Sequence, residues 1–210
     1  MKYDTLFIDW DGTLSQSRLW GHWKDDPKRA DDYQSIQECV FQSSDPDDTF
    51  QRWMLGKLTT EQALAVAAAK TGIDYAQLLE HMRHSCQNMS FIDERLPHLL
   101  RAVQERGVRI VIATDNMDCF TRWTVPALRV NTFSDDILSS HLVGAFKRET
   151  ATDGSSLFFG DYLRRHTMQP GQVALLDDGA KNEAVAAFGI DFIHVSLEQP
   201  ATTLLDKLLL

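Results

Sequence analysis

Short apolar runs recur along the chain and alternate with longer segments of helical periodicity. Four runs are typical of strands buried on both faces, because they are almost continuously apolar and rich in β-branched or aromatic residues. They are "TLFID" from Thr5, "VRIVIAT" from Val108, "VALLDD" from Val173 and "IDFIHV" from Ile190. The run "DILSSHLVG" from Asp136 is a weaker fifth candidate.

Helical patterns lie between these runs. The segment "DERLPHLLRAVQERG" repeats its leucines and valine on one face and stops at Gly107. The segment "NEAVAAFG" from Asn182 follows the same logic and stops at Gly189. Strands that alternate with helices predict a doubly wound α/β fold with a parallel, Rossmann-like sheet.

The stretch from residue 16 to residue 91 shows no strand pattern. It contains a strong helix, "TTEQALAVAAAKTG", with Thr59 or Thr60 as its cap and Gly72 as its stop. Further helical candidates are "YAQLLEHMRHSCQNM", "DDYQSIQECVFQ" and "DDTFQRWMLG". We therefore expect a helical insert at 16–91, placed after the first strand of an α/β core domain made of residues 1–15 and 92–210.

Composition narrows the class of protein and its partners. The 210 residues are 43% hydrophobic and 24% charged, which is typical of a globular protein. The net charge of -9 disfavours nucleic acid and anionic membranes as partners. Three widely spaced cysteines form no zinc set and fit a reducing compartment. No apolar run reaches the roughly 20 residues of a membrane span, and the first residues do not read as a signal peptide. We expect a cytoplasmic protein.

Polar side chains gather at the ends of the expected strands. Asp9 and Asp11 follow the first strand, two residues apart, and Gly12 then permits a tight turn. Other strands end in, or lead to, groups that suit the same crevice: Thr114, Asp115, Asn116, Lys147, Asp177 and Asp178. Clustered carboxylates repel unless a cation lies among them, and an all-oxygen site suits Mg²⁺. A lysine and a threonine beside it suit a phosphate group.

Each of these features has a simpler explanation when it is taken alone. The D-x-D-G-T segment could be a surface turn, Thr114 a strand-end hydroxyl and Lys147 a solvated side chain. The adjacent aspartates at 177 and 178 could open a turn or cap a helix. Their joint placement at strand ends of one fold class favours a common site.

The four segments resemble the motifs of the haloacid dehalogenase (HAD) superfamily, specifically phosphatases that carry a helical cap after the first motif. "FIDWDGT" matches the first motif fully, and "IVIATDN" matches the second. "ILSSHLVGAFK" is similar to the third, and "VALLDDGAKN" matches the fourth, including Asn182. The motifs follow the family's order over nearly the whole chain. Arg148 stands where the family often has proline, so Arg148 is the alternative to Lys147 as the catalytic cation.

The resemblance implies a Mg²⁺-dependent phosphomonoester hydrolase that acts through an aspartyl phosphate on a small phosphorylated metabolite. Asp9 would be the nucleophile and Asp11 the general acid and base, while Lys147 would neutralise charge. The phosphate would be held by residues of the first two motifs: Gly12, Thr114, Asp115 and Asn116. The metal would be held by Asp9, by the backbone carbonyl of Asp11 and by Asp178, with Asp177 as a further ligand or a support.

The insert would then be a cap that selects the leaving group. Arg18 and His22 could bind a polar or anionic leaving group, whereas Trp20 and Trp23 either stack on a ring or fill the core of the insert. We expect a compact substrate such as a sugar phosphate. The alternatives are a phosphosugar mutase, a 2-haloacid dehalogenase, against which Asp11 argues, and a binding module without activity.

Overall fold

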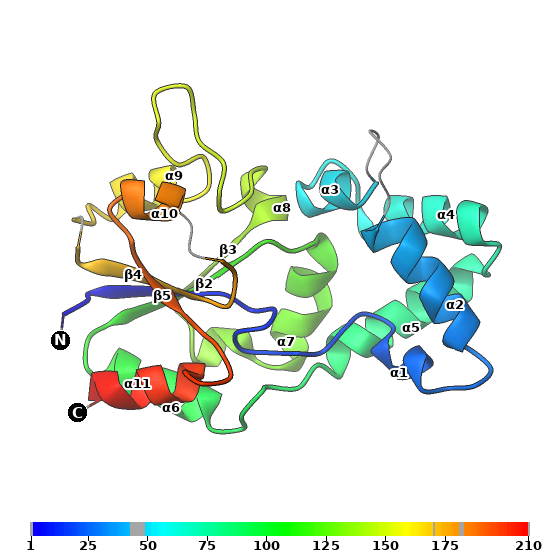
Figure 1. The fold of residues 1–210 in the computed structure, drawn as a ribbon, viewed down its shortest axis with the longest axis horizontal. Coiled ribbons are helices and arrows are strands. Elements are labelled where there is room, and N and C mark those ends of the chain that lie inside the picture. Colours follow the sequence, from blue (N-terminus) through cyan, green and yellow to red (C-terminus); the bar gives the residue numbers. More distant parts are fainter. Residues whose placement is uncertain (1, 43–48, 170, 181–182, 210) are drawn as a thin grey trace.

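Five parallel strands form one sheet at the centre of the core. The computed structural model describes residues 2–42, 49–169, 171–180 and 183–209. The strand order is β3-β2-β1-β4-β5, and every neighbouring pair is parallel (Figure 1). The strands are β1 (Thr5–Ile8), β2 (Arg109–Thr114), β3 (Asp136–Ser139), β4 (Val173–Asp177) and β5 (Asp191–His194). This confirms the expected doubly wound sheet.

Helices cover both faces of the sheet, which explains why its strands are apolar throughout. Leu6 and Ile8 belong to an apolar cluster with residues of α6 (Leu96–Glu105) and α11 (Ala201–Leu209). Phe7, on the opposite face of β1, packs with α9 (Gly160–Arg165) and with Val185 of α10 (Glu183–Ala187). Figure 1 shows these two helix pairs on opposite sides of the sheet.

Several short elements of the core depart from the sequence-based expectation. The run from Asp136 is a strand only to Ser139, because α8 (Ser140–Val143) begins at the next residue and ends at Gly144. After β2 the chain forms a π-helical turn (Phe120–Thr124), the short α7 (Val125–Ala127) and a 3₁₀ turn (Val130–Thr132). Asn182, part of the fourth motif, lies outside the described residues.

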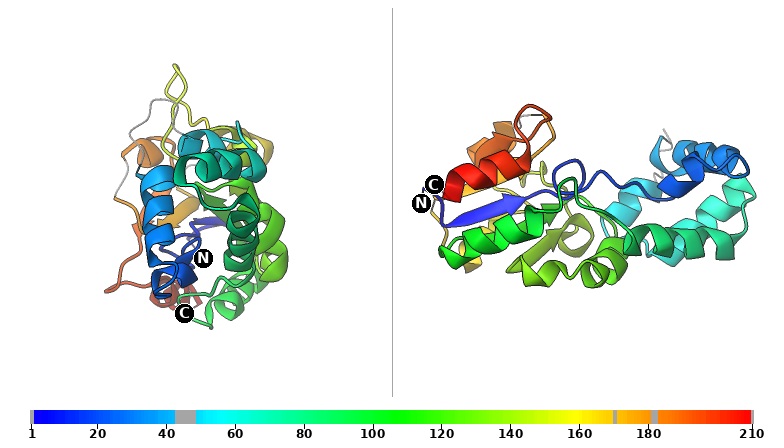
Figure 2. Two further views of the ribbon diagram at one scale, coloured as in Figure 1. Left: turned by 90° about the vertical axis from the view of Figure 1, so that its right-hand side faces the viewer. Right: turned by 90° about the horizontal axis from the view of Figure 1, so that it is seen from below.

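The helical insert lies beyond the carboxyl ends of the strands (Figures 1 and 2). Its helices are α1 (Gly21–Lys24), α2 (Ala30–Ile36), a π-helical turn (Gln37–Phe41), α3 (Thr49–Met54), α4 (Thr60–Thr71) and α5 (Tyr75–Gln87). Thr59 is the N-cap of α4 and forms a capping box with Gln62, which satisfies the first free N–H groups of the helix. The expected helix from Asp31 loses α-helical geometry at the π-helical turn. Asp47 and Asp48 lie outside the described residues.

The insert packs around a second apolar cluster, to which Met117 and Cys119 of the core also belong. Trp20, Trp23 and Trp53 are buried in it together with residues of α4 and α5. The Trp20 indole donates a hydrogen bond to the Leu78 carbonyl at 3.1 Å. Both Trp20 and Trp23 therefore fill the core of the insert, as the simpler of the two sequence interpretations proposed. Within the part of the chain that is described, no helix is long and apolar enough to span a membrane.

Candidate active site

Two carboxylates, those of Asp9 and Asp11, follow the end of β1. Asp9 extends the strand by one residue, because its N–H donates to the Leu176 carbonyl at 2.9 Å. The chain then turns at Gly12, whose φ is +80°, and its N–H donates to the Ser15 carbonyl at 2.7 Å. Trp10, between the two aspartates, is fully buried in the apolar cluster. Asp9 and Asp11 instead meet polar groups from other strands.

Lys147 is buried between two of the carboxylates. Its Nζ atom lies 2.9 Å from Asp9 Oδ1 and 2.5 Å from Asp177 Oδ2. Burial alone would lower the pKa of Lys147, but the charges of Asp9 and Asp177 raise this pKa above its ordinary value. Arg148, the alternative cation, is exposed. The structure therefore brings Lys147, and not Arg148, to Asp9.

Asp115 positions Lys147 by a backbone contact. Its Oδ1 atom accepts a hydrogen bond from the Lys147 N–H at 3.0 Å. We expected Asp115 beside the phosphate, but a carboxylate that accepts this bond offers no donor to a phosphate oxygen. Its geometry fits the positioning of Lys147 better than direct contact with phosphate.

Burial changes the acidity of both N-terminal aspartates. It raises the pKa of Asp9 to about 7, against the opposing charge of Lys147. Desolvation likewise raises the pKa of Asp11 to about 6, while the nearby Arg18 opposes the rise. Asn116 donates a hydrogen bond from Nδ2 to Asp11 Oδ2 at 3.2 Å, and Arg18 lies 4.0 Å from Asp11 Oδ1. A carboxyl group that titrates near neutral pH is suited to giving and taking a proton.

Asp177 and Asp178 differ in their surroundings. Asp177 is buried, and its two oxygens accept hydrogen bonds from Lys147 and from the Gly179 N–H. Asp178 is exposed, and its carboxylate lies against Gly12. A Cβ atom on Gly12 would be 1.9 Å from Asp178 Oδ2, so the missing side chain of Gly12 makes room for this carboxylate.

The donor set fits a magnesium ion. Asp9, Asp177 and Asp178 can bring one carboxylate oxygen each within 4.8 Å of one another. Carboxylate oxygens are the ligands that Mg²⁺ prefers, and a cation would offset the repulsion among them. The side chain of Asp11 does not belong to this group of described residues, which leaves only its backbone carbonyl for the role that the resemblance implied.

Thr114, the last residue of β2, has a buried hydroxyl group that lacks a hydrogen-bond partner among the described residues. Its side chain is fully buried, and among the described residues its Oγ1 atom has no hydrogen-bond partner. Buried polar atoms are rarely left unpaired, so a bound acceptor is a natural partner for this hydroxyl. Thr114 therefore fits the expected contact with a phosphate oxygen.

A cavity of about 340 Å³ lies between Asp11, Asp115 and Asn116 on one side and the insert on the other. The core and the connecting segment contribute Asp11, Arg18, Asp115 and Asn116 to its lining, among others. The insert contributes Gln37, Phe41, Phe50, Met54 and Cys86. A larger cavity of about 430 Å³ lies at the opposite ends of the strands, near Asp4 and Arg109, far from the carboxylate cluster.

The structure places His22 away from this cavity, where the sequence led us to expect a contact with the leaving group. His22 does not belong to the described residues that line it. Its Nε2 atom lies 2.9 Å from His81 Nδ1 of α5, and its ring is 5.0 Å from that of His84. The side chain of His22 therefore faces α5, whereas Arg18 reaches the cavity.

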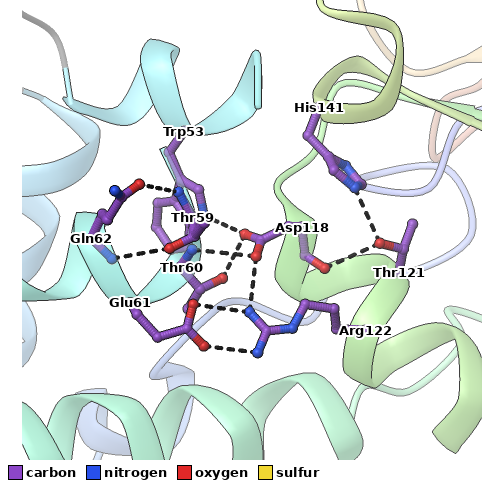
Figure 3. Close-up of polar contacts among 9 residues, drawn as sticks. All are labelled: Trp53, Thr59, Thr60, Glu61, Gln62, Asp118, Thr121, Arg122 and His141. Atoms are coloured by element: carbon purple, nitrogen blue, oxygen red, sulfur yellow. Dashed lines mark hydrogen bonds and ion pairs between the residues drawn. The ribbon is translucent and has the colours of Figure 1, made fainter. Parts of the chain in front are cut away.

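A polar network docks the insert on the core (Figure 3). We call it the Asp118 clamp; it consists of Trp53, Thr60, Glu61, Asp118 and Arg122. Asp118 Oδ1 accepts from the Trp53 indole at 2.8 Å and from the Thr60 hydroxyl at 2.6 Å. Arg122 donates to Asp118 at 3.0 Å and to Glu61 at 2.7 Å. The sequence patterns did not predict this network. Asp118, two positions after Asn116, is the feature of the sequence that could have indicated it.

Comparison with known proteins rests on structure. No protein-family model matches the sequence, and no curated protein matches it. A HAD family enzyme of Bacteroides thetaiotaomicron superposes with a TM-score of 0.69 at 14% identity, over 97% of this chain and 98% of that one. The same enzyme has been solved in complex with magnesium and inorganic phosphate, with a TM-score of 0.67 at 14% identity, over 96% and 98% of the two chains.

Dehalogenases have the same architecture. The L-2-haloacid dehalogenase of Xanthobacter autotrophicus, solved with chloropropionic acid covalently bound, has a TM-score of 0.63 at 13% identity, over 98% of this chain and 88% of that one. These identities are too low to transfer an activity, but the similarity extends over nearly the full length of the chains. Together with the five-stranded parallel sheet and the motif segments at its carboxyl ends, it gives this chain the fold of the haloacid dehalogenase superfamily.

Proposed function

We propose that this protein is a Mg²⁺-dependent phosphomonoester hydrolase that acts through an aspartyl phosphate. One observation carries the proposal: a single turn presents two carboxylates in different settings. Asp9 is buried and paired with Lys147, whereas Asp11 lies at the cavity, in contact with Asn116. One group is held for attack and the other has access to a leaving group.

The reaction proceeds in two steps. In the first, an Asp9 oxygen forms a bond to phosphorus, the bond to the alcohol oxygen breaks, and Asp11 gives that oxygen its proton. In the second, Asp11 takes a proton from a water molecule that attacks phosphorus, and the bond to Asp9 breaks. The products are the alcohol and inorganic phosphate, and both aspartates return to their starting states.

Other residues bind and orient. The Lys147 ammonium offsets the charge of Asp9 and of the phosphoryl oxygens, and the buried Thr114 hydroxyl donates to one of those oxygens. Asp9 and Asp178 would hold the Mg²⁺ ion, with Asp177 beside them as a support, and the ion would supply positive charge to the phosphoryl group when it is bound. The structure of a similarly folded enzyme with magnesium and inorganic phosphate supports this assignment.

The insert and the charge of the molecule complete the proposal. Residues 16–91 would act as a cap, because the cavity lies between the insert and Asp11, the proposed general acid. A cavity of this size suits a small phosphorylated metabolite, and the net charge of -9 argues against nucleic acid as a substrate. The three free cysteines support a reducing compartment such as the cytoplasm.

Dehalogenation of a 2-haloacid is the second candidate. It is favoured by the similarity to a dehalogenase that was solved with chloropropionic acid bound, and by the apolar side chains in the cavity. Asp9 would then attack carbon and release halide. The acidic cluster of Asp177 and Asp178 has no role in that reaction, so we rank it second.

The test replaces the nucleophile. Asp9→Asn should reduce Mg²⁺-dependent phosphate release from para-nitrophenyl phosphate by at least about 10³-fold, because an amide cannot form the phosphoenzyme. Asp4→Asn, an exposed aspartate just before β1, is the matched control and should retain activity. Near-normal turnover by a folded Asp9→Asn protein would contradict the proposed mechanism. Chloride release from 2-chloropropionate without metal, in the absence of phosphatase activity, would favour the dehalogenase.

A further inference from the structure

The lining of the cavity is divided between a polar and an apolar part. Its polar part lies beside the carboxylates: Asn116 donates to Asp11, Arg18 lies 4.0 Å from Asp11, and Asp115 accepts from the Lys147 N–H. Ser17 and Arg18, at the start of the insert, add to this polar part. Among the described residues that the helices of the insert contribute to the lining, Gln37 is the only one with a polar amide or charged side chain. A leaving group that extends from phosphorus toward the insert therefore enters apolar surroundings.

The apolar part has the chemistry of a site for a hydrophobic ring. Phe41 and Phe50 meet edge to face, with ring centroids 4.9 Å apart. Met54, Met89 and Met117 line the same cavity. Methionine sulfur packs well against aromatic and aliphatic groups and adapts to their shape.

This lining penalises hydroxyl groups. A sugar hydroxyl that enters the apolar part gives up water and finds few protein partners, and a hydrophobic pocket discriminates against one added hydroxyl by about 100-fold. The volume of about 340 Å³ is generous for an apolar group. A benzene molecule fits a cavity of roughly 150 Å³, so a ring and a phosphoryl group can be held together.

We infer that the preferred substrate is a phosphate monoester of an apolar alcohol or phenol, about one or two rings in size, and not the sugar phosphate that the sequence suggested. The inference rests on the proposed function and concerns the group on the other side of the scissile bond. In physical terms, the leaving group gains its free energy of binding by burying apolar surface against Phe41, Phe50 and Met54.

A matched pair of esters tests it. Cyclohexylmethyl phosphate and glucose 6-phosphate are both esters of a primary alcohol on a six-membered ring, so they differ chiefly in the hydroxyl groups. With Mg²⁺ we expect kcat/KM to favour the cyclohexyl ester by at least about 100-fold. Equal turnover, or a preference for glucose 6-phosphate, overturns the inference and leaves the proposed function standing.

Variants locate the preference in the cavity. Met54→Gln should lower kcat/KM for the cyclohexyl ester by about 10-fold and leave that for glucose 6-phosphate unchanged or higher, because it adds an amide to the apolar part. Met54→Leu should keep the preference. Leu142→Gln is the matched control, since Leu142 is an exposed residue of the core that does not line the cavity. Equal effects of Met54→Gln on both esters contradict the assignment.

A binding measurement separates the two proposals. Calorimetry with the methylenephosphonate analogues of the same two esters, in the presence of Mg²⁺, needs no turnover. Tighter binding of the cyclohexyl analogue supports the inference even if no ester is hydrolysed, a result that would defeat only the proposed function. Equal or weaker binding of that analogue overturns the inference.

Discussion

Lys147 shows at the scale of a single residue how this site tolerates buried charge. Its ammonium contacts Asp9 and Asp177, and all three side chains are buried. Without the lysine, two carboxylates would share one buried site and repel each other. A metal ion beside Asp178 would complete this compensation. Lys147 therefore offsets one of the three negative charges of Asp9, Asp177 and Asp178, and a bound cation would offset the rest.

The unequal surroundings of the paired aspartates give a first prediction. Asp178→Ala should weaken Mg²⁺ binding by more than about 100-fold, because the exposed carboxylate of Asp178 is available to the ion. Asp177→Ala should weaken it by only about 10-fold, since its oxygens already accept hydrogen bonds from Lys147 and Gly179. Calorimetric titration with Mg²⁺ measures both. The reverse order would exchange the roles of ligand and support.

Gly12 gives a second prediction. Gly12→Ala should reduce Mg²⁺ affinity at least about 10-fold, because the new Cβ atom would displace the Asp178 carboxylate. Gly72→Ala is the matched control. Gly72 has a φ of +74°, so an alanine there would be similarly strained, but nothing lies within 4 Å of the added Cβ atom. Both variants should lose about 1 kcal/mol of stability from backbone strain. Equal Mg²⁺ affinity in the two variants would show that the close approach has no role.

At the scale of elements, the insert is joined to the core by more than its two connecting segments. The Asp118 clamp ties α3 and the start of α4 to the π-helical turn after β2 (Figure 3). Nearby, the Ser140 hydroxyl donates to the Met54 carbonyl at 2.7 Å. Residues that follow β2 and β3 therefore hold α3 in place. Phe50 and Met54 of α3 line the cavity.

Removing the clamp should loosen this docking. Asp118→Ala leaves the Trp53 indole and the Thr60 hydroxyl without their acceptor, so we expect the free energy of unfolding to fall by about 2 to 3 kcal/mol. Asp161→Ala, which removes an exposed carboxylate from ion pairs with Arg164 and Arg165, should cost less than about 1 kcal/mol. Urea unfolding compares them, and equal losses would mean that the clamp adds no stability.

At the scale of the whole molecule, the sheet and the insert enclose the site from two sides. Three neighbouring strands deliver Asp9, Thr114 and Asp177 to one edge of the sheet, because β1 lies between β2 and β4. The insert lies beyond that edge (Figure 1). A bound cation would add a further link between segments that Lys147 already joins by its ion pairs with Asp9 and Asp177.

Chelation tests this dependence. EDTA should abolish activity, and Mg²⁺ should restore it, because the carboxylate cluster needs a cation. Independently of activity, Mg²⁺ at about 100 times its dissociation constant should stabilise the fold by about 2.7 kcal/mol, seen as a higher midpoint in thermal unfolding. Full activity after thorough chelation, or no thermal shift with Mg²⁺, would count against the metal site.

The sequence by itself determined where the strands lie and which polar residues follow each of them. It also determined which of these residues meet at one edge of the sheet. These are local properties: a buried strand needs a continuous apolar run, and Asp9, Asp11 and Gly12 follow such a run directly. The parallel arrangement follows from the alternation of strands and helices, and parallel strands bring their carboxyl ends to one edge. The roles given to these residues in catalysis stay predictions.

Only the tertiary structure showed that Lys147, and not Arg148, lies beside Asp9, that His22 faces α5 and that Trp20 is buried in the insert. It also revealed the Asp118 clamp and the apolar lining of the cavity. Each of these depends on contacts between distant parts of the chain; Trp53 and Asp118, for example, are 65 residues apart. Periodicity and turn residues report which face of an element is buried, but not which other element covers it, because that depends on how the helices of the insert pack on the core.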